Sequence, residues 1–210
     1  MAWWIASDCG ENMNKWIVTN NIASINAENW RFANRVIIEG QVELFPSLPH
    51  QCSDLLCLMI KNNHNLENIP EGFLRRMPNL TYLSLERTGI KELPKDIKCL
   101  VNLQYLNISR TNISSLPKEL VYLKKLQYLI CNHLERLGKV EDLMSRLQML
   151  KVIDIFPSGW VDLEQLKKLK KHVKAIGMRV VYIKRGSPTT LMFANYSALA
   201  IQFGYHLSFI

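Results

Sequence analysis

The sequence lacks the motifs of the common catalytic and nucleotide-binding folds. It contains no G-x-x-x-x-G-K-[ST] phosphate loop, no G-x-G-x-x-G fingerprint and no H-E-x-x-H metal motif. The nearest approach to a metal cluster is a group whose spacing matches none of the standard zinc sites: His50, Cys52, Cys57 and His64. No nucleophile and base form a recognisable pair. We therefore predict a protein that is not an enzyme and that has no cofactor or metal ion.

Paired cysteines and an export signal are also missing. The five cysteines are odd in number and do not bracket the chain as disulfide-linked caps would. The apolar start of the chain is interrupted at Asp8 and Glu11, too early for a signal peptide. These features predict a reducing, cytoplasmic setting. Glycosylation is the competing interpretation, since four N-x-[ST] matches occur, although such short matches arise easily by chance: Asn79, Asn107, Asn112 and Asn195.

After Arg185 the sequence contains no Asp, Glu, Lys or Arg. A membrane helix would fit this stretch by length. Polar residues are spread through it, however, and each would be costly in a bilayer: Asn195, Ser197, Gln202 and His206. We expect an irregular C-terminal tail over residues 181–210 and no transmembrane segment.

The charge that remains is predominantly positive, with a net value of +8. Much of it comes from the run LKKLKKHVK, which ends at Lys174. Such a run is commonly the solvated outer face of a helix, and the alternative is contact with anionic lipid. No aromatic residues interleave with these lysines, as bases stacking on a protein would require, so we expect no nucleic-acid partner.

What the sequence does contain is a 23-residue repeat that begins at Leu80. LTYLSLERTGIKELPKDIKCLVN is followed from Leu103 by LQYLNISRTNISSLPKELVYLKK, and LQYL opens a third copy at Leu126. The positions that repeat are apolar, with L-x-x-L-x-L at the head of each unit. This pattern is typical of leucine-rich repeats, whose units stack into a solenoid with one continuous core.

Each unit predicts a strand, a turn and a short segment across the back. The L-x-L leucines alternate with mostly polar residues, which predicts a strand with the leucines inward. Thr88 and Thr111 follow the strand, where a short hydroxyl can bond backbone groups that have left the ladder. Pro94 and Pro117 then prevent further strand pairing, and the segments behind them are predicted to be helical or 3-10 turns.

Looser copies extend the array on both sides of these units. We expect strands near Val36, Leu58, Leu83, Leu106, Leu129 and Ile153, with a last one near Ile176. Residues 1–29 do not fit the pattern and are assigned to an N-terminal cap, and residues 30–180 to the repeat domain. The predicted fold is an α/β leucine-rich-repeat solenoid, a horseshoe arc with a parallel concave sheet and short helical or 3-10 convex segments.

The residues between the inward leucines form columns on the concave face, because neighbouring strands lie about 4.8 Å apart. Outward tyrosines and arginines on a rigid sheet are typical of protein-binding hot spots. The alternative is that the tyrosines only pack across strands and stiffen the sheet. The residues predicted to contact a protein partner are Tyr82, Ser84, Glu86, Arg87, Tyr105, Asn107, Ser109, Arg110, Tyr128, Ile130 and Asn132.

The repeats from Ile69 to Leu129 resemble those of plant nucleotide-binding leucine-rich-repeat disease resistance proteins. MAWWIASDCGE is similar to the M-A-L-W-I-A-S-D run that closes the nucleotide-binding module in the coiled-coil group. The resemblance covers residues 1–180 and implies that residues 1–29 are the remnant of that module. The family's coiled coil, phosphate loop and Met-His-Asp motif precede such a run, so the chain looks like a truncated member without the nucleotide-binding domain.

The resemblance implies a non-catalytic recognition or autoinhibitory module in plant innate immunity. Its partner would be a pathogen effector, a guarded host protein or a nucleotide-binding domain, and its location the cytoplasm or the periphery of the plasma membrane. Two alternatives stay open at this point. The first alternative is a generic intracellular leucine-rich-repeat scaffold, and the second is a non-functional truncated resistance-gene product.

Overall fold

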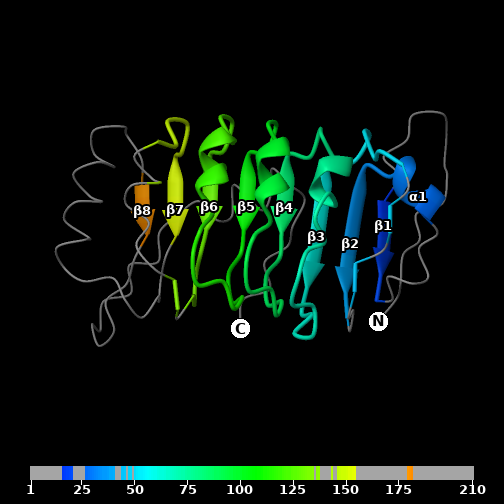
Figure 1. Ribbon diagram of the computed structural model, residues 1–210, viewed down its shortest axis with the longest axis horizontal. Coiled ribbons are helices and arrows are strands. Elements are labelled where there is room, and N and C mark those ends of the chain that lie inside the picture. The colour runs from blue at the N-terminus through cyan, green and yellow to red at the C-terminus, as the bar shows by residue number, and fades with distance from the viewer. Residues whose placement is uncertain are drawn as a thin grey trace.

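The computed structural model describes residues 16–20, 27–40, 44–45, 47–48, 50–134, 136–137, 143, 146–154 and 179–181. Eight parallel strands form one sheet there, in the order of the sequence, so that β1 and β8 lie at opposite ends (Figure 1). The strands are β1 (Trp16–Thr19), β2 (Arg35–Glu39), β3 (Cys57–Lys61), β4 (Tyr82–Ser84), β5 (Tyr105–Asn107), β6 (Tyr128–Ile130), β7 (Val152–Asp154) and β8 (Arg179–Val181).

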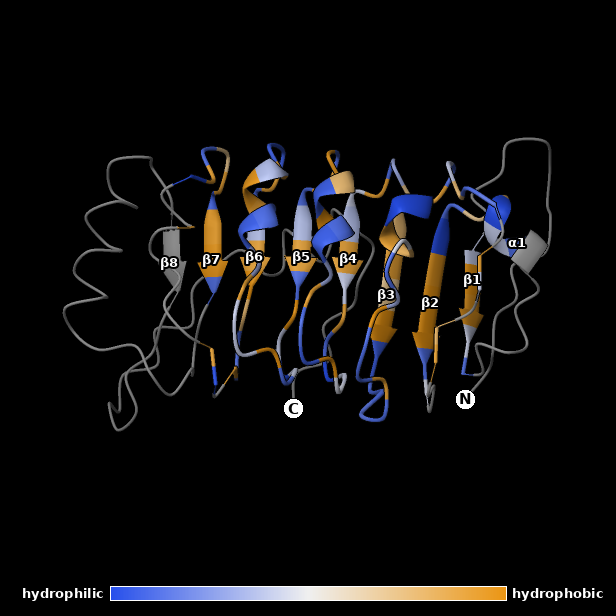
Figure 2. Ribbon diagram, viewed as in Figure 1, coloured by the Kyte–Doolittle hydropathy of each residue, from blue (hydrophilic) through white to orange (hydrophobic). Residues whose placement is uncertain are grey.

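The connections between the strands carry the short helical segments that the repeat predicts. One α-helix, α1 (Ala27–Arg31), precedes β2, and three 3-10 helices follow β3, β4 and β5: η2 (Leu74–Arg76), η3 (Lys95–Cys99) and η4 (Lys118–Tyr122). Pro94 and Pro117 stand immediately before η3 and η4 in extended conformation, which confirms their predicted role. Figure 2 shows hydrophilic residues on these segments, while β2, β3 and β7 are mostly hydrophobic.

The six strands expected between Val36 and Ile153 are confirmed as β2 to β7. The two end strands differ from the prediction. The sheet already begins at Trp16, inside the segment assigned to the cap, and β1 pairs with β2 in parallel. At the other end, Val180 stands opposite Ile153, which places β8 four residues beyond the position expected from the repeat pattern. The spacings at these two ends depart from 23, which is why the repeat pattern missed both strands.

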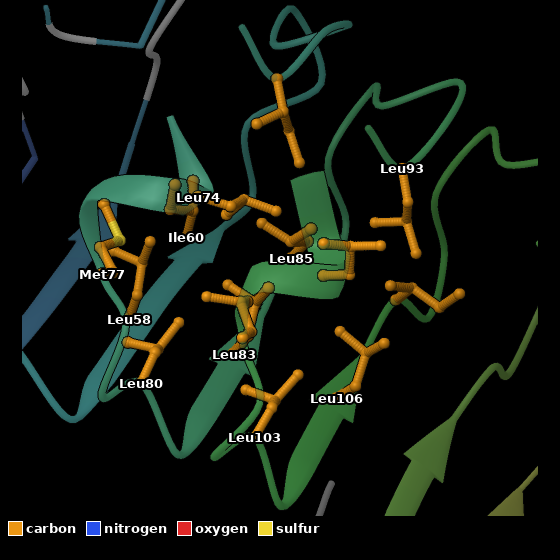
Figure 3. Close-up of a cluster of buried hydrophobic side chains, with 14 of the residues drawn as sticks. Leu58, Ile60, Leu74, Met77, Leu80, Leu83, Leu85, Leu93, Leu103 and Leu106 are labelled. Atoms are coloured by element: carbon orange, nitrogen blue, oxygen red, sulfur yellow. The ribbon is translucent and has the colours of Figure 1, made fainter. Parts of the chain in front are cut away.

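The core consists of the inward leucines of successive strands. Leu58, Leu83, Leu106 and Leu129 occupy one register position and are fully buried. Figure 3 shows leucines of neighbouring units converging behind the sheet, together with Met77 from the connection that follows η2. Burying one such side chain contributes about 1.5–3 kcal/mol. Since each unit covers the next, the apolar face of a unit is closed only by its neighbours.

The turns after the strands are closed by side-chain hydrogen bonds, as predicted for the threonines. Thr88 Oγ1 donates to the carbonyl oxygen of Leu85 at 2.8 Å, and Thr111 Oγ1 donates to Ile108 at 2.8 Å. Both threonines are buried, so these bonds satisfy carbonyl groups that water cannot reach.

Polar side chains also link neighbouring units along the edges of the array. The Asn79 amide donates to the carbonyl oxygen of Ser53 at 3.0 Å and accepts from Asn102 Nδ2 at 3.3 Å, and Lys125 Nζ donates to Asn102 Oδ1 at 2.7 Å. On the helical side, Arg75 N donates to the buried Asp96 Oδ2 at 3.3 Å, which joins η2 to η3. These bonds fix how far one unit is rotated against the next.

Two predictions fall outside the described residues. They concern the lysine run that ends at Lys174 and most of the tail over residues 181–210. In the part of the chain that is described, no helix is long and apolar enough to cross a membrane.

Candidate protein-binding face

The face of the sheet opposite the leucine core carries two rows of side chains in register. The first row collects the leading position of each strand: Trp16, Arg35, Cys57, Tyr82, Tyr105, Tyr128 and Val152. The second row lies two residues further along: Val18, Ile37, Met59, Ser84, Asn107, Ile130 and Asp154. Residues two apart in a strand point to the same side, so both rows share one face.

The three tyrosines of the first row contact one another across the strands. The rings of Tyr82 and Tyr105 are stacked, with centroids 4.2 Å apart and planes 4° from parallel. The rings of Tyr105 and Tyr128 are tilted by 38° at 6.3 Å. Both arrangements fall in the range that aromatic pairs favour, and each contributes about 0.5–1.5 kcal/mol beyond area burial. Cross-strand packing of the tyrosines, one of the two predicted roles, is therefore present.

The row continues beyond the tyrosines to the N-terminal end of the sheet. The guanidinium carbon of Arg35 lies 4.5 Å from the ring centroid of Trp16, a cation–π contact. Neither residue was among the predicted contact residues: Trp16 lies on β1, which was not recognised as a strand, and Arg35 begins β2, whose outward positions were not included. The signal was present, however, in the apolar run Trp16, Ile17 and Val18.

Members of the two rows form a small apolar cluster on this face of the sheet, separate from the leucine core. Cys57, Met59 and Tyr82 form it, with the partly buried Ile37 and Tyr105 packed against them. The middle of the face at β2 to β5 is therefore apolar and aromatic. Tyrosine and methionine are both enriched where proteins contact each other.

Polar side chains are linked by hydrogen bonds on and beside the second row between β5 and β7. Ser109 N donates to Asn107 Oδ1 at 2.9 Å, and Asn132 N donates to Ser109 Oγ at 3.2 Å. Asn132 Nδ2 in turn donates to Asp154 Oδ2 at 2.9 Å. Asn107, Ser109 and Asp154 are buried, so these residues form a connected network that orders the face at β5 to β7.

The eleven predicted contact residues differ in how much surface they offer. Arg87 and Arg110 are exposed, and four others are partly exposed: Glu86, Tyr105, Tyr128 and Asn132. Five are buried, contrary to the expectation that every outward position offers contact area: Tyr82, Ser84, Asn107, Ser109 and Ile130. Short side chains between longer neighbours are shielded, and Tyr82 is covered in part by its stacking on Tyr105. The buried five support the face, and the other six remain predicted contacts.

Tyr105 is the most perturbed acidic group of the face. Burial raises the pKa of its phenol to about 12, and the nearby carboxylates of Glu86 and Asp154 add to the rise. Hydrogen bonds with Tyr82 and Asn107 act in the opposite direction. The hydroxyl is therefore protonated at neutral pH and takes part in hydrogen bonds with Tyr82 and Asn107 at the centre of the tyrosine row.

The turns that follow the strands hold a third row with unusual backbone geometry. In five successive units the same position has a positive φ: Gly40 (148°), Asn62 (56°), Arg87 (56°), Arg110 (57°) and His133 (56°). Glycine and asparagine adopt this conformation readily, whereas most other L-residues lose about 1–2 kcal/mol there. The row nevertheless carries two arginines and a histidine, and all three are exposed.

The cysteines and histidines considered as a metal cluster do not gather. Cys52 belongs to the leucine core, whereas Cys57 belongs to the apolar cluster on the opposite face of the sheet. Burial raises the pKa of the Cys52 thiol, with a partial offset from Arg76. Across the described ranges, no three His, Cys, Asp or Glu side chains come together as a metal ion would need.

Parallel strands in sequence order, inward leucines and 3-10 segments behind them define a leucine-rich-repeat solenoid. Solved structures share this fold. A leucine-rich-repeat protein of Leptospira interrogans superimposes with a TM-score of 0.53 at 20% identity, covering 74% of this chain and 50% of that one. The Drosophila Toll–Spatzle complex gives 0.56 at 19% identity, covering 69% of this chain and 20% of that one.

The family model of the leucine-rich repeat region matches residues 34–179, so the chain belongs to the leucine-rich-repeat family. Its repeats are of the kind found in plant disease resistance proteins, as the resemblance implied. The Arabidopsis thaliana disease resistance protein RFL1 is 36% identical over 106 residues, covering 48% of this chain and 12% of the relative. Disease resistance protein SUMM2 of the same plant is 32% identical over 106 residues, with the same coverage.

A longer match reaches beyond the central repeats. A probable disease resistance protein of Arabidopsis thaliana is 31% identical over 189 residues, which cover 86% of this chain and 19% of the relative. The chain thus spans less than a fifth of the length of the relatives it matches.

Proposed function

We propose that this chain is a protein-recognition module in plant innate immunity, and that its partner binds the sheet face carrying the tyrosine row. The single observation that carries the proposal is the row itself, in which Tyr82, Tyr105 and Tyr128 pack on one another in units that also carry exposed arginines. Tyrosine offers large contact area at little entropy cost, and arginine offers directed bonds to carboxylates. The similarity to disease resistance proteins supports the biological setting.

A protein is favoured over a small molecule because the row extends across several strands. A small ligand is held in a concave pocket that encloses most of its surface. Here the contact residues are distributed over units that are 23 residues apart, and their backbone positions are fixed by the sheet. Such a rigid, broad surface loses little entropy when a large partner binds.

Three kinds of partner agree with this face: a pathogen effector, a guarded host protein, and a nucleotide-binding domain held in an autoinhibited state. We place the chain in the cytoplasm, with the periphery of the plasma membrane as the alternative. In the described part of the chain, Cys52, Cys57, Cys99 and Cys131 form no disulfide, which supports a reducing setting.

Proximity labelling in plant cells tests the proposal with two matched variants. The first changes Tyr105 and Tyr128 to alanine. The control changes Tyr122 to alanine, since this exposed tyrosine lies on η4, behind the sheet. Proteins labelled by the parent and the Tyr122→Ala variant but lost from the double variant are the expected partners. With a purified partner, the double variant should lose more than about 2 kcal/mol of binding free energy.

The opposite pattern would overturn the proposal. If the Tyr122→Ala variant loses its labelled proteins while the Tyr105/Tyr128 variant keeps them, the partner binds the helical side. Thermal melting of all three proteins separates loss of binding from loss of folding.

A further inference from the structure

The row of positive-φ turns shows a contrast within this one chain. The first unit places Gly40 there with a φ of 148°, and the second places Asn62 there with a φ of 56°, a conformation that asparagine adopts readily. The next units place Arg87, Arg110 and His133 in the same conformation. The turn itself therefore gains nothing from an arginine. Residues whose backbone conformation is unfavourable for their type are concentrated at functional sites, so these positions indicate a role for the arginine side chains.

The guanidinium groups of Arg87 and Arg110 differ in their contacts, but neither is paired with an acidic side chain among the described residues. Among the described residues, the side chain of Arg87 has no hydrogen-bond or ion-pair partner. Arg110 Nη2 lies 3.1 Å from His133 Nε2. A guanidinium can only donate, so Nε2 is the acceptor in this contact, which holds the Arg110 side chain in position. Among the residues that the structure describes, no carboxylate forms an ion pair with either arginine.

Glu86 is the acidic residue nearest in sequence, and it does not change this conclusion. It belongs to the strand side of the turn, where its carboxylate acts on the Tyr105 phenol. Lys61 takes the corresponding place in the preceding unit, because Asn63 is bridged to Thr88. The column on the sheet therefore alternates in sign, while the row of turns beside it carries only positive charge at Arg87 and Arg110.

We propose that Arg87 and Arg110 form a carboxylate-binding rim that recognises an acidic segment of the protein bound on the sheet face. The inference rests on the proposed function and names the chemistry of its partner. Arginine's planar fork matches a carboxylate in two parallel hydrogen bonds. Adjacent units place the two forks about 4.8 Å apart at the backbone, the spacing of paired strands. Neighbouring acidic residues of one segment fit that spacing.

The position of the rim also constrains the bound segment. Tyr82 begins β4, and Arg87 lies five residues further on, in the turn that follows the strand. A segment lying along the strands would thus place an apolar side chain on the tyrosine row and acidic residues on the rim.

A binding experiment with the whole chain tests the rim directly. The probes are a labelled short peptide of alternating glutamate and serine, its glutamine counterpart, and an oligothymidine of equal charge. The test variant changes Arg87 and Arg110 to asparagine, the residue that the turn already accepts at Asn62. The control changes Lys95 and Lys98 to glutamine, two exposed lysines around η3 that remove the same charge.

We expect the parent to bind the glutamate peptide more tightly than the glutamine peptide, and less tightly as salt is added. The asparagine variant should lose about tenfold in affinity, and the lysine control should stay within about twofold of the parent. The asparagine variant should also melt about 1–3 °C higher than the parent, because the positive-φ strain is relieved.

Four binding results would overturn the inference. These are absence of binding to the glutamate peptide, equal binding by the asparagine variant, equal loss in the lysine control, or tighter binding of the oligothymidine. A lower melting temperature of the asparagine variant would also do so, since the arginines would then be structural. Failure of the proposed function would be seen in a different experiment: the partner would bind the Tyr105/Tyr128 double variant as well as the parent. That result would not change the outcome of the peptide experiment.

Discussion

Tyr82 and Tyr105 stack in parallel at 4.2 Å although they are 23 residues apart in the chain. The stacking exists because β4 and β5 pair with Leu83 opposite Leu106, which places the tyrosines directly beside each other. The apolar core thus sets the register, and the register builds the opposite face. A change in the core should therefore affect binding, whereas a change in the tyrosine row should leave the core intact.

The first prediction concerns that core. Leu106→Ala should lower the free energy of unfolding by about 2–5 kcal/mol, because Leu106 is fully buried between Leu83 and Leu129. Urea denaturation followed by circular dichroism measures the change. Val101→Ala serves as the control, since Val101 is 52% exposed and should change the stability little. Equal effects of the two substitutions would contradict the register.

The second prediction concerns the bond between η2 and η3. Asp96→Ala removes the carboxylate that accepts from Arg75 N and should destabilise the fold by about 1–2 kcal/mol. Glu119 occupies the same position one repeat later and is partly exposed. Glu119→Ala should therefore have a smaller effect in the same thermal melt. A larger loss at Glu119 would show that the link between η2 and η3 is unimportant.

The third prediction concerns pH. The pKa of Tyr105 is about 12 in the folded chain and near 10 when unfolded. Because the folded value is raised, the neutral phenol stabilises the fold fully below pH 10, and this contribution is lost as the pH rises towards 12. Tyr105→Phe should reduce the loss of stability across that interval. Tyrosinate absorbance during alkaline titration should correspondingly lack its last component in the variant.

The fourth prediction concerns thiol chemistry. Cys99 is partly exposed on η3, whereas Cys131 is fully buried, and burial together with the nearby Asp154 raises the pKa of the Cys131 thiol. Since the thiolate is the reactive form, Cys99 should be alkylated well before Cys131. Peptide mass spectrometry after brief alkylation of the native chain measures both rates. Comparable rates would show that the core at β6 opens readily.

The sequence predicted the middle of the fold well and its ends poorly. From Leu80 to Leu126 the spacing is constant, so the inward leucines, the turn threonines and the prolines could be assigned from period alone. Trp16 and Val180 lie where the spacing departs from that period, and pairing with the neighbouring strand decided their place. The 23-residue period of the sequence does not predict the length of such irregular connections.

The candidate face was predictable only in outline. The tyrosine column followed from the repeat, but the contact of Arg35 with Trp16 depended on a strand, β1, that the pattern did not show. The burial of Ser84 and Asn107 depends on the neighbouring side chains, and the positive φ of Arg87 depends on the turn geometry. Neither can be read from one unit in isolation.

The equal spacing of the central units affects how the number of repeats can change in evolution. The segments that begin at Leu80 and Leu103 are of the same length and pair through equivalent positions. Misaligned recombination between their coding sequences would insert or remove one whole unit in frame. Each new junction would repeat a pairing that the chain already makes, so a descendant could gain another tyrosine and another arginine without a new fold having to arise.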